Sequence, residues 1–438
     1  MERVKWGVLG TANIASWGTI PGMKKAESVE LYAIAGRDIK KAERFKNEFG
    51  FAKAYGSYDE LLEDPHVQAV YIPLPNSLHL EWVKKALNAR KHVLCEKPIA
   101  LNAMEAVEMF KTAEKNKVHL MEAYAYLHSP YIKSLKDDIA SGVIGEVDYI
   151  DTAFVTQGYK EDIRLHRELG GGAMYDLGCY CTSMILSLVE ATPTFVRAEA
   201  DFSDDGIDLM TSGLIRFDNG VRATFDVGMV LGQNSDSRYD RLFIHGSKGY
   251  IRSDVEYNKA GTVSYRIYTK YGFEERTLQI PNNYSLEIEQ LSQCILYGDT
   301  PEISPEFSIM NSVLMEKILD KMGYFYFDDD EGSENGVEFL NIDEKKLKEQ
   351  AEQKEKERIK NSPLTGAHQE IKISEDMEKA LEALEEKISD KIEEIEEQIS
   401  EKKEENPFEE IPLEDDDSDY DESIDDITEV LTADKRKN

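Results

Sequence analysis

Lys97, Asp176 and Tyr180 are the side chains of this sequence best suited to chemistry at an alcohol or a carbonyl group. When a hydride leaves carbon, a proton leaves oxygen, so such a site needs an acid or base within hydrogen-bond reach of that oxygen. Tyr180 can serve if a neighbouring cation favours its phenolate, and Lys97 could provide that cation. Asp176 could orient the substrate or complete a proton path. The alternative is that Tyr180 packs in a core and Asp176 caps a helix.

The sequence around these residues indicates how they are held. Lys97 follows an apolar run and lies between a glutamate and a proline, a setting poorly explained as that of a solubilising surface lysine. Asp176 and Tyr180 follow three glycines, residues 170–172, which let the backbone approach another group closely. If the run after the glycines is helical, Asp176 and Tyr180 lie on one face at positions i and i+4.

The first 125 residues alternate short apolar strands with helices, which predicts a parallel, doubly wound sheet. The predicted strands cover residues 4–9, 29–35, 67–72, 92–95 and 118–122, and the predicted helices cover residues 39–49, 58–63, 78–89 and 103–115. Asn102 followed by Glu105 gives the last of these helices a start that is similar to a capping box. A sheet of this kind binds its ligand at the carboxyl ends of its strands, and Lys97 lies at one of them.

The first predicted strand ends in Gly10-Thr11-Ala12-Asn13-Ile14-Ala15. This turn has the form of a dinucleotide fingerprint with alanine in the second and third glycine places. The fingerprint provides a tight turn, a backbone that can touch a pyrophosphate, and a helix N-terminus whose free N–H groups face the anion. Gly10 meets the first requirement. Ala12 and Ala15 meet the others less completely because each adds a methyl group.

The end of the second predicted strand bears on the identity of the dinucleotide. An NAD site usually has Asp or Glu there to hold the ribose hydroxyls. This sequence has Gly36-Arg37-Asp38 instead, and Glu30 lies at the start of the strand. Arg37 could make a bidentate contact with a 2′-phosphate and stack on adenine, or Arg37 and Asp38 could simply cap the next helix. We therefore favour NADP over NAD as the cofactor.

Five motifs together resemble one known family. They are Gly7-Val8-Leu9-Gly10-Thr11-Ala12-Asn13-Ile14-Ala15, Pro73-Leu74-Pro75-Asn76-Ser77-Leu78-His79, Glu96-Lys97-Pro98, Glu122-Ala123-Tyr124, and Gly170-Gly171-Gly172-Ala173 leading into Asp176-Leu177-Gly178-Cys179-Tyr180. The family is that of glucose–fructose oxidoreductase, inositol dehydrogenase and MocA, which are dinucleotide-dependent oxidoreductases. The resemblance covers about residues 3–322. It is closest to the branch of dimeric dihydrodiol dehydrogenases and NADP-dependent xylose dehydrogenases.

The resemblance implies an α/β fold and a reaction class. It implies a Rossmann domain over residues 1–123 and an α+β domain over residues 124–330, whose large, mostly antiparallel sheet commonly forms subunit interfaces in the family. A homo-oligomer, either a dimer or a tetramer, is therefore expected. Helical stretches around residues 286–296 and 305–322 look like the closing elements of the family. The implied activity is hydride transfer between NADP or NAD and a sugar, polyol or trans-diol.

The resemblance also implies roles for individual residues. Catalysis falls to Lys97, Asp176 and Tyr180, although many relatives have His in the place of Tyr180. The residues implied to line the dinucleotide are Gly10, Thr11, Ala12, Asn13, Ile14, Arg37, Leu74, Asn76, His79, Glu96 and Lys97. Those implied to reach the substrate are Tyr126, His128 and Arg164. Many relatives have Arg five residues after the glutamate of the Glu122 motif, where this chain has Leu127, a departure that concerns the substrate side and not the cofactor side.

The charge of the chain excludes some partners and marks a boundary. A net charge of −34 argues against a nucleic-acid partner because so acidic a surface repels phosphate. Residues 331–438 hold 16 lysines and arginines but 37 aspartates and glutamates, a net charge of −21, and only three aromatic residues. A segment of this composition cannot offset its chain entropy with a packed core. The catalytic fold is therefore predicted to end near residue 330.

One stretch of the acidic tail has a regular pattern. Apolar residues at 377, 381, 384, 388, 392, 395 and 399 repeat every 11 residues, which predicts a charged helix over about residues 373–404 and a straight or slightly right-handed coil. This helix could be a coiled coil that self-associates or captures a protein partner, or an exposed single helix. The acidic run at residues 409–426 is predicted to be disordered.

The remaining composition predicts a soluble, cytoplasmic protein that does not enter a membrane. No basic head precedes an apolar core at the N-terminus, and no apolar run is long enough for a membrane span. Four cysteines are too few for a disulfide scaffold and are expected to be reduced and buried. Cys179 and Cys181 have no nearby His or Cys pair at zinc spacing, so no metal site is predicted.

Three functions are compatible with these observations. The chain could be a working dehydrogenase or reductase, a dinucleotide-binding regulator that has lost catalysis, or an interaction protein recruited through its tail. A regulator needs the cofactor loop but not a set of proton-transfer residues. The presence of Lys97, Asp176 and Tyr180 therefore favours the enzyme.

Overall fold

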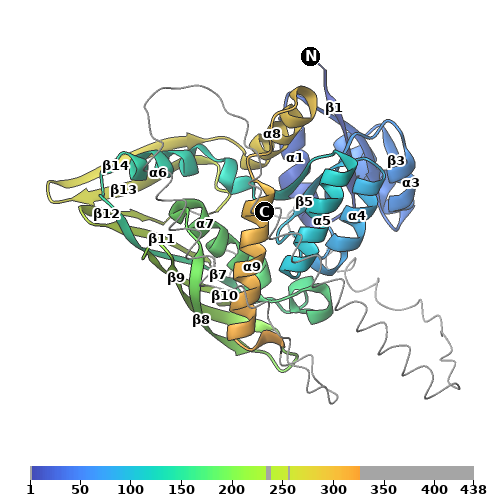
Figure 1. Cartoon of the computed structure of the whole chain (residues 1–438). Helices are drawn as coiled ribbons and strands as arrows, with labels where there is room; N and C mark the ends of the chain where they lie inside the picture. The colour runs from blue at the N-terminus through green and yellow to red at the C-terminus, as the bar shows by residue number, and fades with distance from the viewer. Residues whose placement is uncertain (1, 233–237, 255–256, 326–438) are drawn as a thin grey trace, which may run out of the picture. The chain divides into compact units, whose positions relative to one another are not determined.

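A computed structural model of the chain describes residues 2–232, 238–254 and 257–325. Within these residues the chain forms a six-stranded sheet, sheet A, and an eight-stranded sheet, sheet B, with helices packed on both (Figure 1). The predicted tail over residues 331–438, with its helix at about 373–404, its coiled coil and its disordered end, lies outside the described residues.

Sheet A is built from the first third of the chain, and its strands are parallel. Its strands are β1 (Val4–Leu9), β2 (Val29–Ala35), β3 (Lys53–Tyr55), β4 (Ala69–Ile72), β5 (His92–Glu96) and β6 (Leu120–Ala123), in the order β3-β2-β1-β4-β5-β6. After β1 the chain adds β2 and β3 on one side of the sheet and then β4, β5 and β6 on the other, so the order of strands switches between β1 and β4. The carboxyl ends of these two strands therefore mark the place where such sheets bind ligands.

Helices cover both faces of sheet A. Those of this part of the chain are η1 (Ala15–Thr19), α1 (Ile20–Met23), α2 (Ile39–Phe49), α3 (Tyr58–Glu63), η2 (Asn76–Leu78), α4 (His79–Asn88) and α5 (Ala103–Asn116). Successive strand residues point to opposite faces. Leu9, Ile72 and Val93 pack in one core with α4 and α5, whereas Trp6 and Tyr71 belong to a second core on the other face. Two buried faces explain why these strands are apolar almost throughout.

Sequence signals account for the starts of several helices. Asp38 and Ser57 cap α2 and α3 by accepting hydrogen bonds from first-turn backbone N–H groups. Asn102 accepts from the backbone N–H of Glu105, whose carboxylate in turn accepts from the backbone N–H of Leu101. The predicted start of α5 is therefore confirmed.

Strand β3 was not predicted, and the helix expected after the Gly10 turn was predicted without limits. Strand β3 has three residues and no fully buried side chain, so it lacks the apolar run that marks the other strands. The helix after the Gly10 turn begins at Asn13 and is wound as a π-helix over η1 before it continues as α1. Its Trp17 is exposed and gives no amphipathic signal.

Sheet B is mostly antiparallel. Its strands are β7 (Val147–Gln157), β8 (Pro193–Phe202), β9 (Asp208–Phe217), β10 (Arg222–Leu231), β11 (Arg238–Gly246), β12 (Gly249–Ser253), β13 (Gly261–Thr269) and β14 (Gly272–Ile280), in the order β14-β13-β12-β11-β7-β10-β9-β8. Among the described strand pairs of sheet B, only β7 and β10 are parallel. The helical segments before and between these strands are η3 (Ala125–His128), α6 (Pro130–Ala140), η4 (Ile163–Leu165), η5 (Arg167–Leu169), η6 (Met174–Gly178) and α7 (Cys179–Val189).

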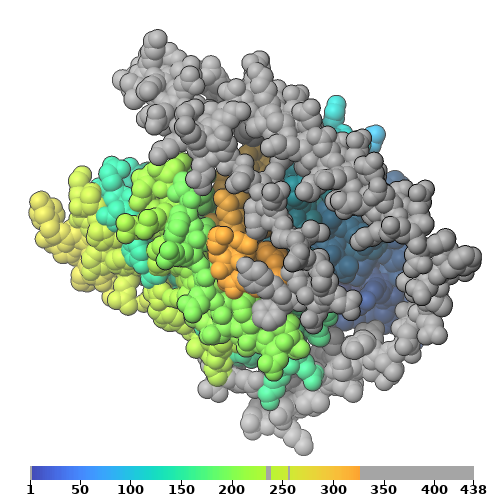
Figure 2. Space-filling view, turned by 60° about the horizontal axis from the view of Figure 1, so that its bottom comes forward, coloured from blue at the N-terminus to red at the C-terminus, as the bar shows by residue number. Residues whose placement is uncertain are grey.

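The last two helices join the two sheets. Helix α8 (Asn283–Tyr297) packs on sheet A, where the indole Nε1 of Trp6 donates to Ser292 Oγ at 3.0 Å. Helix α9 (Pro305–Lys321) contacts α5 on one side and both α7 and β8 on the other. In the space-filling view α9 (orange) lies between the residues of sheet B (green) and those of sheet A (blue) (Figure 2). One apolar core therefore runs continuously from sheet A to sheet B.

The predicted fold class is confirmed: a Rossmann-type parallel sheet is followed by a large, mostly antiparallel sheet. The helices predicted at residues 286–296 and 305–322 correspond to α8 and α9. All four cysteines are free and buried. Among the helices of the described segments, none is long and apolar enough to cross a bilayer.

Candidate active site

A buried ion pair joins the two sheets at the carboxyl edge of sheet A. Lys97 follows directly after β5, and its Nζ lies 2.9 Å from Asp176 Oδ1 and 2.8 Å from the Asp176 carbonyl oxygen. Their side chains are 11% and 15% exposed. The structure therefore brings together two of the three residues that the sequence singled out, from positions 79 residues apart.

Arg164 adds a second cation to Asp176. Its Nε lies 2.6 Å from Asp176 Oδ2, and its Nη1 lies 2.9 Å from Asp162 Oδ1. Burial opposes the charge of Asp176, but Arg164 and Lys97 outweigh it and hold the pKa of this carboxyl well below its usual range. Burial likewise opposes the charge of Lys97, and the Asp176 carboxylate outweighs it and raises the pKa of the ammonium group. Both groups are therefore charged at neutral pH.

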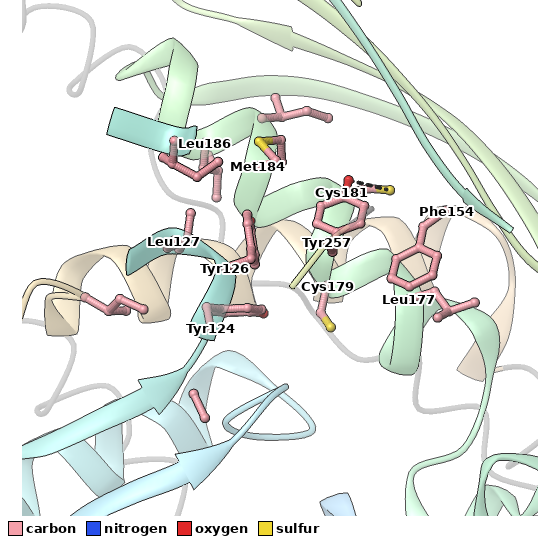
Figure 3. Close-up of a cluster of buried hydrophobic side chains, with 14 of the residues drawn as sticks. Tyr124, Tyr126, Leu127, Phe154, Leu177, Cys179, Cys181, Met184, Leu186 and Tyr257 are labelled. Atoms are coloured by element: carbon pink, nitrogen blue, oxygen red, sulfur yellow. Dashed lines mark hydrogen bonds between the residues drawn. The ribbon is translucent and has the colours of Figure 1, made fainter. Parts of the chain in front are cut away.

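Tyr180 lies in the first turn of α7 beside this ion pair. The Nζ of Lys97 is 4.8 Å from the centre of the Tyr180 ring, a cation–π contact. Four other aromatic rings have centroids 5.2 to 6.0 Å from the Tyr180 ring: Tyr124, Tyr126, Phe154 and Tyr257. Figure 3 shows Phe154 and Tyr257 side by side in this cluster, where their rings stack 5.0 Å apart.

The surroundings of Tyr180 bear on its protonation, which the sequence left dependent on a neighbouring cation such as Lys97. Burial and the nearby carboxylate of Glu96 raise the pKa of Tyr180 well above its ordinary value. The Lys97 ammonium lies over the ring face and bonds to Asp176, and its charge does not outweigh these two effects. Tyr180 is therefore a neutral phenol in the structure, able to donate its proton.

A glycine turn positions Asp176. Gly172 has φ +119°, and a Cβ there would lie 2.1 Å from Asp208 Oδ1, so only glycine fits. Asp208, at the start of β9, accepts hydrogen bonds from the Met174 backbone N–H at 2.7 Å and from Thr211 Oγ1 at 2.9 Å. These bonds anchor the π-helical turn η6, which carries Asp176 into α7. Such π-turns occur often at functional sites.

Two further side chains hold the glycine turn. Asn76 Nδ2 donates to the Gly170 carbonyl at 2.8 Å, and the Tyr324 hydroxyl donates to the Gly171 carbonyl at 3.0 Å. Arg167 stacks on the Tyr324 ring at 3.9 Å. Sequence analysis missed Asp208 and Tyr324 because they follow no motif and come from β9 and from the chain after α9.

The Gly10 turn lies at the carboxyl end of β1, where a dinucleotide would bind. Gly10 has φ +124°, and a Cβ there would lie 3.3 Å from Leu74 Cδ2, which fills the space behind the turn. Thr11, Ala12 and Ile14 are half-buried, and Asn13 is exposed at the start of the following helix. A tight turn before a helix N-terminus is the arrangement that binds a pyrophosphate through backbone N–H groups. These residues fit a dinucleotide.

Arg37 and Asp38 separate into two roles at the end of β2. The Asp38 carboxylate caps α2 by accepting from the Lys40 backbone N–H at 2.7 Å. The Arg37 side chain is exposed, and among the described residues it forms no hydrogen bond or ion pair. The capping alternative therefore holds for Asp38, while the Arg37 guanidinium is available to a ligand.

Two residues predicted to line the dinucleotide have their polar groups engaged within the protein. His79 is fully buried, and its two ring nitrogens lie 2.9 Å from the carbonyl oxygens of Leu74 and Pro98. It thus ties the loops after β4 and β5 together, which positions Leu74 and the segment of Lys97. Glu96 accepts from the Tyr71 hydroxyl at 2.5 Å and from the Lys97 backbone N–H at 3.3 Å.

The residues predicted to reach the substrate divide into two groups. Arg164 contacts Asp176, and Tyr126 packs near the Tyr180 ring while its hydroxyl lies 2.7 Å from Ser183 Oγ. The His128 side chain is 2% exposed and lies 3.2 Å from Glu302, in the segment before α9. No contact among the described residues joins His128 to Lys97, Asp176 or Tyr180.

Two family models match the chain. The model described as "Oxidoreductase family, NAD-binding Rossmann fold" matches residues 4–124. The model described as "GFO/IDH/MocA C-terminal domain" matches residues 132–252. The two matches correspond to sheet A with its helices and to the greater part of sheet B.

Several relatives are similar over almost their whole length. The chain is 33% identical over 310 residues to D-xylose 1-dehydrogenase (NADP(+)) 2 of Haloferax volcanii, which covers 69% of this chain and 93% of the relative. It is 29% identical to trans-1,2-dihydrobenzene-1,2-diol dehydrogenase of Xenopus tropicalis, covering 74% of this chain and 99% of the relative. A crystal structure of a 3-ketoreductase from Actinomadura kijaniata in complex with NADP and TDP-benzene is 29% identical, with a TM-score of 0.69, and covers 73% of this chain and 98% of that chain.

Proposed function

The chain belongs to the GFO/IDH/MocA family of oxidoreductases, and we propose that it transfers a hydride between NADP and a CH–OH or carbonyl group of a sugar, polyol or diol. The observation that carries this proposal is the buried cluster of Lys97, Asp176 and Tyr180 at the carboxyl edge of sheet A. A neutral phenol beside a fixed ion pair supplies the proton transfer that hydride chemistry at oxygenated carbon requires.

The dinucleotide would be held by the Gly10 turn and by Arg37. The bound nicotinamide supplies or accepts the hydride. Backbone N–H groups at the start of the helix after Gly10 would bind the pyrophosphate, and the guanidinium of Arg37 would bind the 2′-phosphate. Leu74 and Asn76 border this place from the loop after β4, and Glu96 and Lys97 border it from the end of β5.

The protein residues manage the proton. In the reducing direction the O–H bond of Tyr180 breaks, and its proton moves to the substrate oxygen as the carbonyl becomes an alcohol. The phenolate left on Tyr180 is stabilised by the Lys97 ammonium over its ring. Asp176 holds that ammonium in place and, with Arg164, orients the substrate hydroxyls. In the oxidising direction each step runs backwards.

The substrate class rests on the relatives and on the aromatic cluster. The relatives are named for a sugar, a dihydrobenzene diol and a deoxy-sugar nucleotide. The rings of Tyr126, Phe154 and Tyr257 surround Tyr180, and flat apolar walls of this kind suit the C–H faces of a ring-shaped substrate.

The experiment that tests this function is a panel of sugars, polyols and diols, each offered with NADP and with NAD. The absorbance of the reduced nicotinamide reports turnover. Turnover with at least one alcohol, faster with NADP, is the expected result. Tight dinucleotide binding without turnover of any member, in either direction, would instead identify a dinucleotide-binding regulator.

We also propose a homo-oligomer, a dimer or a tetramer, formed through the face of sheet B that α7 leaves open. Aromatic rings form a ladder across that face: Tyr149, Phe243, Tyr250, Tyr268 and Phe273. Phe273, at the end of the ladder, is 63% exposed, and a contiguous apolar patch of this kind can mark a protein interface. Light scattering should give a monomer mass for a Phe243→Glu, Tyr268→Glu double variant and a multiple of it for the wild type.

The role of residues 331–438 is proposed from sequence alone, as are the domain limits, the coiled coil and the cytoplasmic location. A chain that ends at Asp330 should keep its turnover. A chain that ends at Met322 should lose it, because it lacks Tyr324 and the hydrogen bond to Gly171. Light scattering on the chain ending at Asp330 and on a Leu384→Ser, Ile388→Ser, Ile395→Ser variant tests whether the tail self-associates. An unchanged mass in both would favour an exposed single helix.

A further inference from the structure

Asn258 lies close to the hydroxyl group of Tyr180. It is in the loop between β12 and β13, and its Nδ2 is 3.4 Å from the Tyr180 hydroxyl and 3.4 Å from the Tyr284 hydroxyl. Its backbone has φ +61°, a left-handed conformation that Asn adopts more readily than most residues. Within the described parts of the chain, it is the one polar side chain that forms a hydrogen bond with the Tyr180 hydroxyl oxygen.

The other end of the amide lies beside a small cavity. Asn258 Oδ1 is buried and has no hydrogen-bond partner among the described residues, and the same is true of Asn283 Oδ1. Both residues line a cavity of about 20 Å³. This space suits a single water molecule, whose two hydrogens can serve two acceptors. A water donating to both oxygens would keep Oδ1 toward the cavity and the Nδ2 hydrogens toward the two phenols.

The direction of this contact matters for proton transfer. The amide N–H groups can only donate, so the Tyr180 oxygen accepts from Asn258 and keeps its own hydrogen free for another acceptor. When that hydrogen leaves, the oxygen becomes negative, and a hydrogen bond to a charged oxygen is stronger than one to a neutral phenol. The contact therefore favours the state in which the proton has left.

We propose that Asn258 is a positioning residue for Tyr180: it aims the phenolic hydrogen at the substrate oxygen and stabilises the phenolate that remains. This inference rests on the proposed function. In reduction, the proton moves from Tyr180 to the substrate while the hydride comes from the reduced nicotinamide. In oxidation, the phenolate takes the proton of the alcohol, and the same hydrogen bond lowers the pH at which that base is present.

Two variants remove the donor in different ways. Asn258→Asp keeps the size and the tolerance of a left-handed backbone but cannot donate when ionised. Asn258→Gly removes the whole side chain at a position whose positive φ suits glycine. The matched control is Tyr284→Phe, which removes the other phenol at the same amide and leaves the contact with Tyr180 intact.

The measurement is the pH dependence of kcat and KM for oxidation, with NADP and the fastest alcohol of the substrate panel. In both Asn258 variants the apparent pKa of the acidic limb of the pH–rate profile should rise by about one, because a hydrogen bond to the charged oxygen is lost. Below that limb kcat should fall on the order of tenfold. KM should change less than kcat, and Tyr284→Phe should keep the wild-type limb.

The possible outcomes distinguish a failure of the Asn258 role from a failure of the proposed function. A limb that stays at the wild-type pH in both Asn258 variants overturns the role of Asn258, even if kcat falls, because a purely structural defect lowers rates without moving the limb. A limb that also moves in Tyr284→Phe overturns it as well, since the effect then belongs to the loop. If the wild type turns over no alcohol or carbonyl, the proposed function fails and this inference fails with it.

Discussion

The two sides of the candidate site are built in different ways. The dinucleotide side consists of a backbone turn at Gly10 and an exposed, uncommitted guanidinium at Arg37, all within the first 40 residues. The chemical side consists of buried charged and phenolic groups, Lys97, Asp176 and Tyr180, brought from both sheets and already bonded to one another. The first side presents groups without partners in the described parts of the chain, whereas the second is held by contacts within the protein.

This difference indicates what each side contributes. Exposed groups interact weakly with each other in water and are free to bind a phosphate. Buried charges need partners, because removing one partner leaves the other unpaired in a poorly solvated place. Changes on the dinucleotide side should therefore act mainly on affinity, and changes on the chemical side should act on turnover and stability together.

The largest effect is expected for Lys97→Ala. It removes the cation over the Tyr180 ring and leaves Asp176 with Arg164 alone. Turnover should fall on the order of a hundredfold or more, the scale of a lost acid–base group. Lys84→Ala is the control, since Lys84 forms an exposed ion pair with Glu108 and its loss should cost almost nothing. Similar turnover in the two variants would remove Lys97 from the chemistry.

Gly172→Ala should destabilise the chemical side without replacing a charged residue. The new methyl group would lie 2.1 Å from Asp208 Oδ1, at a φ of +119°. Strain and overpacking together should lower the free energy of unfolding by about 3 kcal/mol. Gly50→Ala is the matched control, because Gly50 has φ +86° and open space around it. That change should cost only about 1 kcal/mol in urea unfolding.

Arg37→Ala should weaken NADP binding while NAD binding hardly changes. Loss of charge-assisted hydrogen bonds to a 2′-phosphate should raise the Kd for NADP on the order of tenfold or more. Arg37→Lys keeps the charge but not the bidentate geometry, so its Kd should be intermediate. Fluorescence titration of both cofactors measures this. An equal loss for NADP and NAD would show that Arg37 does not read the phosphate.

A further prediction concerns the pH dependence of stability that Asp208 confers. Burial raises the pKa of Asp208 to about 7, above its ordinary value of about 3.9 in an unfolded chain. A raised pKa in the folded state stabilises the fold below about pH 4, and this stabilisation is lost as the pH rises through about 7. Between about pH 4 and pH 7 the titration of Asp208 should therefore lower the free energy of unfolding by at most about 1.4 kcal/mol per pH unit.

Asp208→Asn tests this sign. It keeps an acceptor for the Met174 N–H but has no titrating proton, so its unfolding free energy should fall less steeply with pH than that of the wild type. Burial also raises the pKa of Glu122 to about 7, so part of the slope should remain. A slope equal to that of the wild type would show that Asp208 does not carry a shifted proton.

The sequence alone was sufficient for features that depend on neighbouring residues. The predicted limits are confirmed for β1, β2, α2 and α3. The spacing of apolar residues and the capping residues that set these limits lie in or next to each segment. The Gly10 turn and the order of motifs led to the fold and to Lys97, Asp176 and Tyr180. Family resemblance added residues, such as Asn76 and Arg164, that no spacing would have singled out.

Features that depend on distant residues were not predicted. Asp208, Tyr324 and Asn258 reach the site from β9, the segment after α9 and the loop before β13, and none is part of a motif. The protonation of Tyr180 could not be read from the sequence for the same reason. Its protonation is set by burial among aromatic rings from several elements, and sequence spacing carries no measure of that burial.

The most direct measurement on the chemical side compares Tyr180→Phe with the wild type in a single turnover. Each protein is saturated with reduced NADP, mixed with the best carbonyl substrate, and followed by the absorbance of the nicotinamide. Tyr180→Phe should bind the dinucleotide as the wild type does, because the ring remains. It should oxidise the dinucleotide more slowly by on the order of a hundredfold or more, because the proton donor is lost. Oxidation at the wild-type rate in Tyr180→Phe would contradict the assignment of Tyr180 as the proton donor.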